Sequence, residues 1–229
     1  LLAGCAVEEA ARPPDPATVR ARLMKLLPPG TGDAAGWASD IQTSFSLLGL
    51  EPSVDALCAA IAVIAQESSF RADPAVPNLP AIAWKEIDDR ASSIGVPSLV
   101  VRTAMRLPSS DGRSYADRID AARTERDLSE TFEDLIGRVP MGKRLFGNLN
   151  PVRTGGPMQV SIAWAERYSD ERRRYPYADA DSIRREVFTR RGGLYFGIAH
   201  LLDYPAGYDR MLYRFADFNT AFAFMTRAA

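Results

Sequence analysis

The chain has 229 residues, of which 46% are hydrophobic and 25% are charged, which gives enough apolar side chain for one globular domain with an elaboration. The formal net charge is −1, so the chain has no overall positive field to attract nucleic acid, and nucleic-acid binding is disfavoured. No apolar run approaches the roughly 20 residues that cross a bilayer, which disfavours an integral membrane protein.

The first five residues, with the sequence LLAGC, resemble the lipobox of bacterial lipoproteins. In that family a signal peptidase cleaves before the cysteine, whose sulfur carries diacylglycerol. The resemblance predicts that residues 1–4 end a signal peptide and that Cys5 is the lipidated first residue. Ala6, in place of an aspartate, favours the outer membrane by the lipoprotein sorting rule, with the domain facing the periplasm or the cell surface. The alternative is that the string ends an ordinary apolar segment.

Residues 5–18 are expected to form the lipid anchor and a tether, because prolines alternate there with charged residues. With Cys5 acylated, Cys58 has no partner for an intrachain disulfide. Cys58 lies on an apolar helical face, so we expect a packed small hydrophobic residue and not a reactive thiol.

Apolar residues at helical spacing predict three helices at the start of a domain that spans residues 19–229. The first begins near Val19, and the second carries a stripe from Trp37 that Gly49 closes. The third is capped by Ser53 and runs through apolar residues to Glu67. Glu67 is therefore placed at the end of an almost wholly apolar helix.

Residues 78–148 contain further helical segments, and we interpret them as an inserted helical lobe. A loop rich in glycine and proline follows, and its pattern allows a short strand pair around residues 145–160. Helices are then expected around Trp164, over about 193–204, and from about 209 onward. Because the last pattern is still helical at residue 229, we expect the chain to be clipped there. The predicted class is mainly α.

Glu67 is the strongest candidate for an acid catalyst. A carboxyl group at the end of an apolar helix is partly withdrawn from water, which raises its pKa and keeps it protonated near neutral pH. Taken alone, however, Glu67 is better described as a glutamate that turns into solvent at a helix end.

Other catalytic chemistries have little support in the sequence. His200 is the only histidine, and it stands within a helical pattern without a nucleophile-elbow motif, so a packed residue is expected. One histidine and two cysteines predict no metal site, and we expect no cofactor. The arginines at 172–174, 184, 185, 190 and 191 are interpreted as solvated helix faces.

Three motifs in order change the assessment of Glu67. Residues 66–70 (QESSF) resemble the Glu-Ser motif of the lytic transglycosylases, residues 156–160 (GPMQV) their Gly-Leu-Met-Gln motif, and residues 216–220 (ADFNT) their Ala-x-Tyr-Asn motif. The resemblance covers residues 53–70 and 155–224, about half of the chain. It implies the helical core of goose-type lysozymes and lytic transglycosylases, with 78–148 inserted. It also fits an uncharacterised family of proteobacterial outer-membrane lipoproteins with this core.

The resemblance implies cleavage of the β-1,4 bond between N-acetylmuramic acid and N-acetylglucosamine in peptidoglycan glycan strands. Glu67 would protonate the leaving oxygen and then act as base on the muramic acid 6-hydroxyl, which gives a 1,6-anhydro product with one carboxylate. In this scheme Met158 and Gln159 line the glycan cleft and Asn219 supports its floor. The substrate-binding positions carried over from the motifs are Ser68, Gly156, Met158, Gln159, Phe218 and Asn219.

Three departures from the family pattern keep a second function open. Phe218 replaces a tyrosine whose hydroxyl bonds the catalytic glutamate in the family, Pro157 replaces a leucine, and the inserted lobe separates Glu67 from the second motif. The alternative is a catalytically silent outer-membrane lipoprotein that binds glycan or an envelope protein. A third interpretation is a helical scaffold in which the motifs are coincidental.

Overall fold

The computed structural model describes residues 14–141, 144, 147–172, 175–177, 180 and 182–203. Cys5, Phe218, Asn219 and the helix expected from about residue 209 therefore lie outside the described residues. Over the described part the chain is mainly helical, as predicted, with ten α-helices, one short 3-10 helix at Gly147–Leu149 and one two-stranded sheet.

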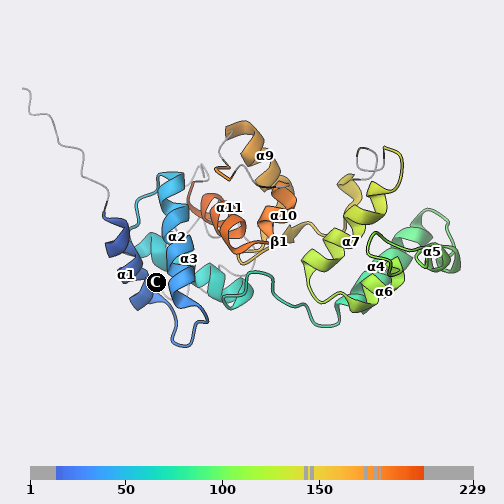
Figure 1. Ribbon diagram of the computed structural model, residues 1–229, viewed down its shortest axis with the longest axis horizontal. Helices are drawn as coiled ribbons and strands as arrows, with labels where there is room; N and C mark the ends of the chain where they lie inside the picture. The colour runs from blue at the N-terminus through green and yellow to red at the C-terminus, as the bar shows by residue number, and fades with distance from the viewer. Residues whose placement is uncertain are drawn as a thin grey trace, which may run out of the picture.

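The helices form two groups that lie side by side along the long axis of the molecule (Figure 1). The first group combines segments from both ends of the chain, and the second lies within residues 78–148, the range for which the sequence predicts an inserted lobe. The first group contains α1 (Pro16–Leu26), α2 (Ala34–Leu48), α3 (Val54–Ser68), α9 (Ile162–Arg172), α10 (Ile183–Val187) and α11 (Arg190–Leu202). The second contains α4 (Leu79–Ser93), α5 (Ser98–Ala104), α6 (Tyr115–Ala121) and α7 (Glu125–Gly137).

Side-chain caps fix where the helices of the first group begin. Asp15 accepts a 3.1 Å hydrogen bond from the Thr18 amide and starts α1 at Pro16. The helix thus begins inside the range 5–18 that was expected to be a tether. Ser53 caps α3 by accepting from the Ala56 amide, as the sequence predicts.

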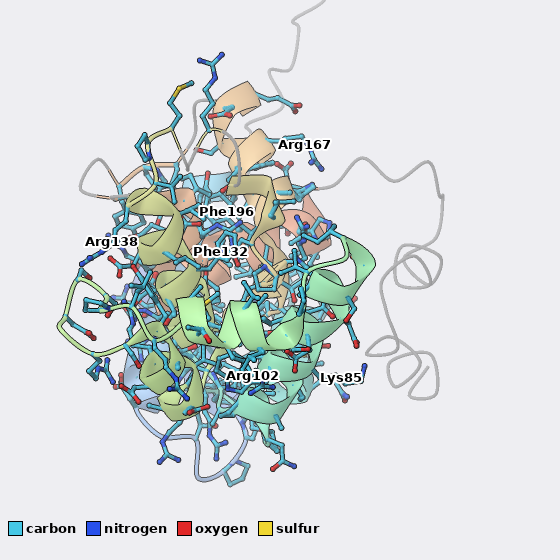
Figure 2. All side chains as sticks on the ribbon, turned by 90° about the vertical axis from the view of Figure 1, so that its right-hand side faces the viewer. Lys85, Arg102, Phe132, Arg138, Arg167 and Phe196 are labelled. Carbon is cyan, nitrogen blue, oxygen red and sulfur yellow. The ribbon has the colours of Figure 1, made fainter. Side chains whose placement is uncertain are left out.

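Helix α11 forms the centre of the hydrophobic core and packs against α2, α3, α10 and the second strand. Leu194, Phe196 and Ile198 on this helix are fully buried. Burial of one such side chain stabilises the folded state by about 1.5–3 kcal/mol. Figure 2 shows Phe196 in the interior, while Arg138 and Arg167 lie at the periphery.

The second group buries apolar side chains of its own, such as Tyr115 and Ile119, and it contacts the first group through polar groups and through Leu128 of α7, which packs against the core. Capping boxes begin α6 and α7, at Ser114 and Thr124 respectively. The Arg184 guanidinium of α10 donates to the Val152 carbonyl at 3.1 Å and lies 3.8 Å from the Glu133 carboxylate of α7. No described helix has the length and apolar character that crossing a bilayer requires.

Two expectations from the sequence are wrong. Cys58 is exposed, because α3 turns Leu57 and Ile61 toward the core and Cys58 toward solvent, although apolar residues surround it in the sequence. Arg184 and Arg190 are not solvated helix faces. The Arg184 side chain is only 15% exposed, and Arg190 forms ion pairs that connect α11 to α2.

Candidate functional site

Glu67 is the next-to-last residue of α3, and its side chain is half-buried. Burial raises the pKa of its carboxyl group, in the direction expected at the end of an apolar helix. Among the described residues none donates a hydrogen bond to this carboxyl group, so none of them offsets the cost of burying its charged form. The carboxyl group therefore favours the protonated state more than an ordinary glutamate does.

The chain makes a tight turn directly after Glu67. Ser69 and Phe70 both have left-handed backbone angles, with φ of 49° and 59°, which cost of order 1–3 kcal/mol each for residues other than glycine. The turn directs the Phe70 ring onto Trp37 of α2, where the two ring centroids lie 5.3 Å apart in an edge-to-face contact. Strain of this kind next to a half-buried acid is typical of functional sites.

Ser68 is buried, and its hydroxyl group donates a 2.9 Å hydrogen bond to the Ile64 carbonyl one turn earlier. The hydroxyl hydrogen is thus used within α3 and is not directed at Glu67. The predicted substrate contact of Ser68 stays a prediction.

The second motif forms the tip of a β-hairpin between β1 (Thr154–Gly155) and β2 (Val160–Ser161). Gly156 has φ of 75°, and a Cβ atom there would overlap the Val187 carbonyl oxygen of α10. Met158 is only 7% exposed and packs onto Gly197 of α11. Both residues therefore hold the hairpin against the core, and the Met158 side chain is buried there and does not open into a cleft.

Gln159 is the polar residue of the hairpin that faces the second group of helices. Its Oε1 accepts a 2.9 Å hydrogen bond from the Thr154 hydroxyl, and its Nε2 donates a 3.1 Å bond to Glu125 Oε2 of α7. The Gln159 backbone is left-handed, with φ of 48°. The side chain is thus held in one orientation between the hairpin and α7.

Glu125, which accepts the bond from Gln159, and the nearby Asp73 are two carboxyl groups that no motif in the sequence singles out. Burial raises the pKa of Glu125, although the bond from Gln159 opposes the shift and the nearby Asp73 adds to it. Burial likewise raises the pKa of Asp73, against a hydrogen bond with Thr124. Asp73 follows Glu67 by a short loop, which is a weak signal, whereas Glu125 resembles any acidic residue in a first helical turn.

The loop after α3 brings these elements together. Ala75 forms an antiparallel bridge with Thr124, and the Val76 amide donates a 2.8 Å bond to the Arg123 carbonyl. The segment that leaves Glu67 therefore runs along the start of α7, where Glu125 contacts Gln159. Helix α11 also packs against both α3 and the second strand. The described residues contain no group of three or more His, Cys, Asp or Glu side chains arranged for a metal ion.

Two cavities lie near this region, and Glu67 lines neither of them. One has a volume of about 530 Å³, has mainly apolar walls, and reaches Glu125 and Thr154 at one end. The other, of about 770 Å³, is polar and lies between α7 and α10.

His200 is packed, as the sequence predicts. Its ring lies 4.4 Å from the Trp164 ring, centroid to centroid, and burial lowers the pKa of the imidazole to about 4. His200 is therefore neutral at physiological pH and belongs to an aromatic cluster on α9 and α11.

Comparison with known proteins gives the family of the chain. A family described as "Protein of unknown function (DUF1615)" matches residues 30–229. The "Uncharacterized protein YaiW" of Escherichia coli (strain K12) is 50% identical over 207 residues, which cover 90% of this chain and 56% of that protein. The chain thus spans a little over half the length of this relative. No solved structure matches the chain. On the extent of the family match, the chain belongs to the DUF1615 family.

Proposed function

We propose that this chain is a lysozyme-like peptidoglycan lytic transglycosylase domain of an outer-membrane lipoprotein, with Glu67 as its acid and base. The observation that supports the proposal most is the half-buried Glu67 carboxyl group at the end of α3, whose pKa is raised by burial. The three ordered motifs supply the substrate class, the bond between N-acetylmuramic acid and N-acetylglucosamine.

One carboxyl group is sufficient for this reaction. A raised pKa keeps a larger fraction of Glu67 protonated, so that it donates its proton to the glycosidic oxygen as the bond breaks. The resulting carboxylate then removes the proton of the muramic acid 6-hydroxyl, whose oxygen attacks the anomeric carbon. No described residue holds the Glu67 proton in a hydrogen bond, which leaves the proton available for transfer.

In this proposal the glycan lies along residues 71–77, between the end of α3 and the start of α7. Gln159 supports this course, because its amide is fixed at the far end of that segment by Thr154 and Glu125. The left-handed turn at Ser69 and Phe70 supports it as well, because it redirects the chain directly after Glu67.

The lipid anchor is a second part of the proposal. Cys5 would carry acyl chains in the outer membrane, and each buried methylene contributes about 0.8 kcal/mol to anchoring. Helix α1 begins at Pro16, so few residues separate the anchor from the domain. Even fully extended, such a linker spans at most roughly 35–40 Å, which would keep the domain close to the membrane on its periplasmic or outer face.

The test is turnover of purified peptidoglycan sacculi by the full chain, followed by mass spectrometry. The proposal predicts anhydro-muropeptides with the wild type and their loss in Glu67→Gln. Asp55→Asn is the matched control, since it neutralises an exposed carboxyl group in the first turn of the same helix and should leave turnover unchanged. A wild type that releases no anhydro-muropeptides rejects the enzymatic proposal.

A second candidate, a catalytically silent lipoprotein that binds glycan or an envelope protein, is favoured by one observation. The side chains of three predicted substrate-binding residues make their contacts inside the protein. Ser68 donates a hydrogen bond within α3, Met158 packs in the core, and Gln159 bonds to Thr154 and Glu125. This candidate predicts saturable binding to soluble peptidoglycan fragments that survives Glu67→Gln, with no product. Turnover by the wild type excludes it.

A further inference from the structure

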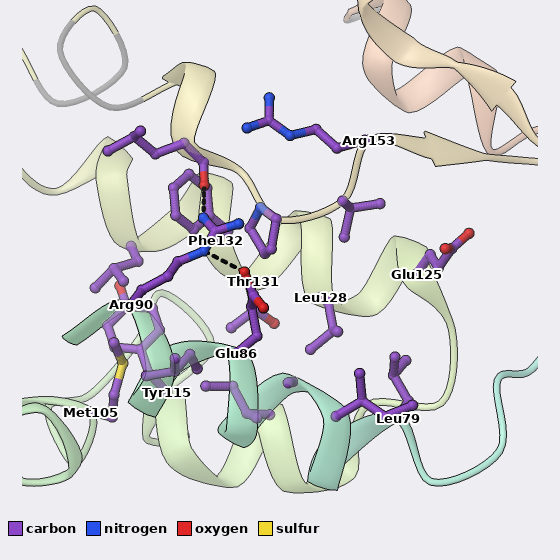
Figure 3. Close-up of a pocket in the computed structure, with 18 of the residues that line it drawn as sticks. Leu79, Glu86, Arg90, Met105, Tyr115, Glu125, Leu128, Thr131, Phe132 and Arg153 are labelled. Atoms are coloured by element: carbon purple, nitrogen blue, oxygen red, sulfur yellow. Dashed lines mark hydrogen bonds and ion pairs between the residues drawn. The ribbon is translucent and has the colours of Figure 1, made fainter. Parts of the chain in front are cut away.

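An apolar cavity of about 530 Å³ lies inside the second group of helices, between α4, α6, α7 and the segment 149–154 (Figure 3). This volume falls in the range of about 300–1,000 Å³ that is typical of small-molecule sites. Most of the wall is aliphatic or aromatic. Its apolar lining includes Leu79, Ile87, Leu128, Phe132, Leu135 and Leu149.

The polar atoms of several lining residues are already bonded elsewhere. The Tyr115 hydroxyl donates to Asp134 at 3.0 Å, and the Thr131 hydroxyl donates to the Asp127 carbonyl at 2.7 Å. A sugar needs many hydrogen-bond partners from its site, and these walls offer few of them. The cavity is therefore suited to a hydrocarbon chain.

Two arginines and two glutamates line the cavity, and their local partners differ. At one end Arg90 pairs with Glu86 at 2.6 Å and donates to the Leu149 carbonyl at 3.0 Å, so this arginine and this glutamate compensate each other (Figure 3). Near the hairpin, Glu125 accepts the bond from Gln159. Arg153 is an exposed lining residue whose guanidinium has no hydrogen bond or ion pair with any described residue. A guanidinium that pairs with none of the described residues, at the rim of an apolar cavity, favours a ligand with an anionic head.

We propose that this cavity binds a fatty acid, with the hydrocarbon chain between α4 and α7 and the carboxylate paired with Arg153. Removal of each methylene from water favours the chain in the cavity, and the charge pair orients it. The exposed large side chains Ile82 and Leu149 line the same cavity and would be covered by a bound chain. Binding does not involve Glu67, so it holds or fails independently of the enzymatic proposal.

The test is calorimetric titration of the full chain with dodecanoate and with dodecanol. Ala83→Phe places a ring in the cavity and should weaken the binding of both ligands by more than about tenfold. Ala81→Phe is the matched control, because Ala81 is exposed on the same helix and does not line the cavity. Arg153→Gln should lower the affinity for dodecanoate by about fivefold and leave the affinity for dodecanol unchanged. Arg167→Gln, at an exposed position outside the cavity, should change neither affinity.

Several outcomes would overturn the proposal. They are the absence of saturable dodecanoate binding by the wild type, and equal affinities in Ala83→Phe and Ala81→Phe. If Ala83→Phe fails to fold, as judged by circular dichroism, Arg153→Gln still tests the proposal, because unchanged dodecanoate affinity in that variant contradicts the assigned ion pair.

A last experiment measures binding of the full chain to anionic phosphatidylglycerol vesicles. Capture by vesicles without dodecanoate binding would indicate a membrane-contacting surface in place of a fatty-acid site.

Discussion

The amide of Gln159 donates a 3.1 Å hydrogen bond to the Glu125 carboxylate, which joins the β-hairpin to the first residue of α7. Gln159 lies in the hairpin that packs on the first group of helices, whereas Glu125 belongs to the second group. The loop that leaves Glu67 runs along the same end of α7. This contact therefore couples the candidate site to the lobe.

Removal of this bond should destabilise the protein measurably. We expect Gln159→Leu to lower the free energy of unfolding by about 1–2 kcal/mol, because the acceptor is a half-buried carboxyl group. Without the bond, the pKa of Glu125 should rise further, since the bond now opposes the effect of burial. Urea denaturation and NMR titration check the two effects. Gln66→Leu, at an exposed position beside Glu67, should change neither quantity. Additivity of Gln159→Leu and Glu125→Leu in a double-mutant cycle would contradict the coupling.

Gly156 and Gly95 allow backbone strain to be separated from packing. Both have positive φ, 75° and 74°, but a Cβ at Gly156 meets the Val187 carbonyl oxygen whereas a Cβ at Gly95 meets nothing within 4 Å. Gly95→Ala should cost about 1 kcal/mol from strain alone. Gly156→Ala should cost roughly 2–4 kcal/mol, because the hairpin must also shift. Thermal and urea unfolding measure the difference, and equal losses would show that the hairpin does not pack as described.

His200 should make stability depend on pH. Its folded pKa of about 4 lies below the ordinary histidine value of 6.5, so the unfolded chain binds the proton more readily. The stabilising contribution is therefore complete above pH 6.5 and is lost as the pH falls toward 4, by roughly 1–3 kcal/mol after allowance for partial exposure. His200→Phe keeps an aromatic ring beside Trp164 but removes the titration, so its stability should fall less over this range. If the free energies of unfolding of the wild type and of His200→Phe, measured with urea, fall by the same amount between pH 7 and 4, this role for His200 is excluded.

Arg190 should contribute more to stability than a surface ion pair does. Its guanidinium lies 2.6 Å from Asp33 and 2.5 Å from Asp40, which ties α11 to α2. Arg190→Gln should reduce the free energy of unfolding by about 1–2 kcal/mol. The exposed pair of Lys85 with Asp89 is the comparison, and Lys85→Gln should change stability by less than about 0.5 kcal/mol. Similar losses in the two variants, measured at equal salt, would show that the Arg190 contacts add nothing beyond a surface pair.

Much of the helical framework could be predicted because its signals are local. Ser53 caps α3 as expected, Glu67 lies in the last turn of that helix, and α4 to α7 are helices within residues 78–148. Glu67 also has the pKa direction that its apolar helix predicted. The environment of the predicted substrate-binding residues could not be predicted in this way, because the same sequence motif occurs with its side chains packed in the core or exposed in a cleft. Met158 is buried on Gly197, and the hydroxyl of Ser68 is bonded within its own helix.

The sequence by itself determined where helices begin, which of their residues are apolar, and that one glutamate ends an apolar helix, because caps and periodicity act over only a few residues. Only the tertiary structure decided that Cys58 faces solvent, that Arg190 pairs with Asp33 and Asp40, and that Gln159 meets Glu125. These contacts join segments far apart in the chain. They depend on how helix faces pack against one another, and the spacing of residues within one helix carries no information about the face of another.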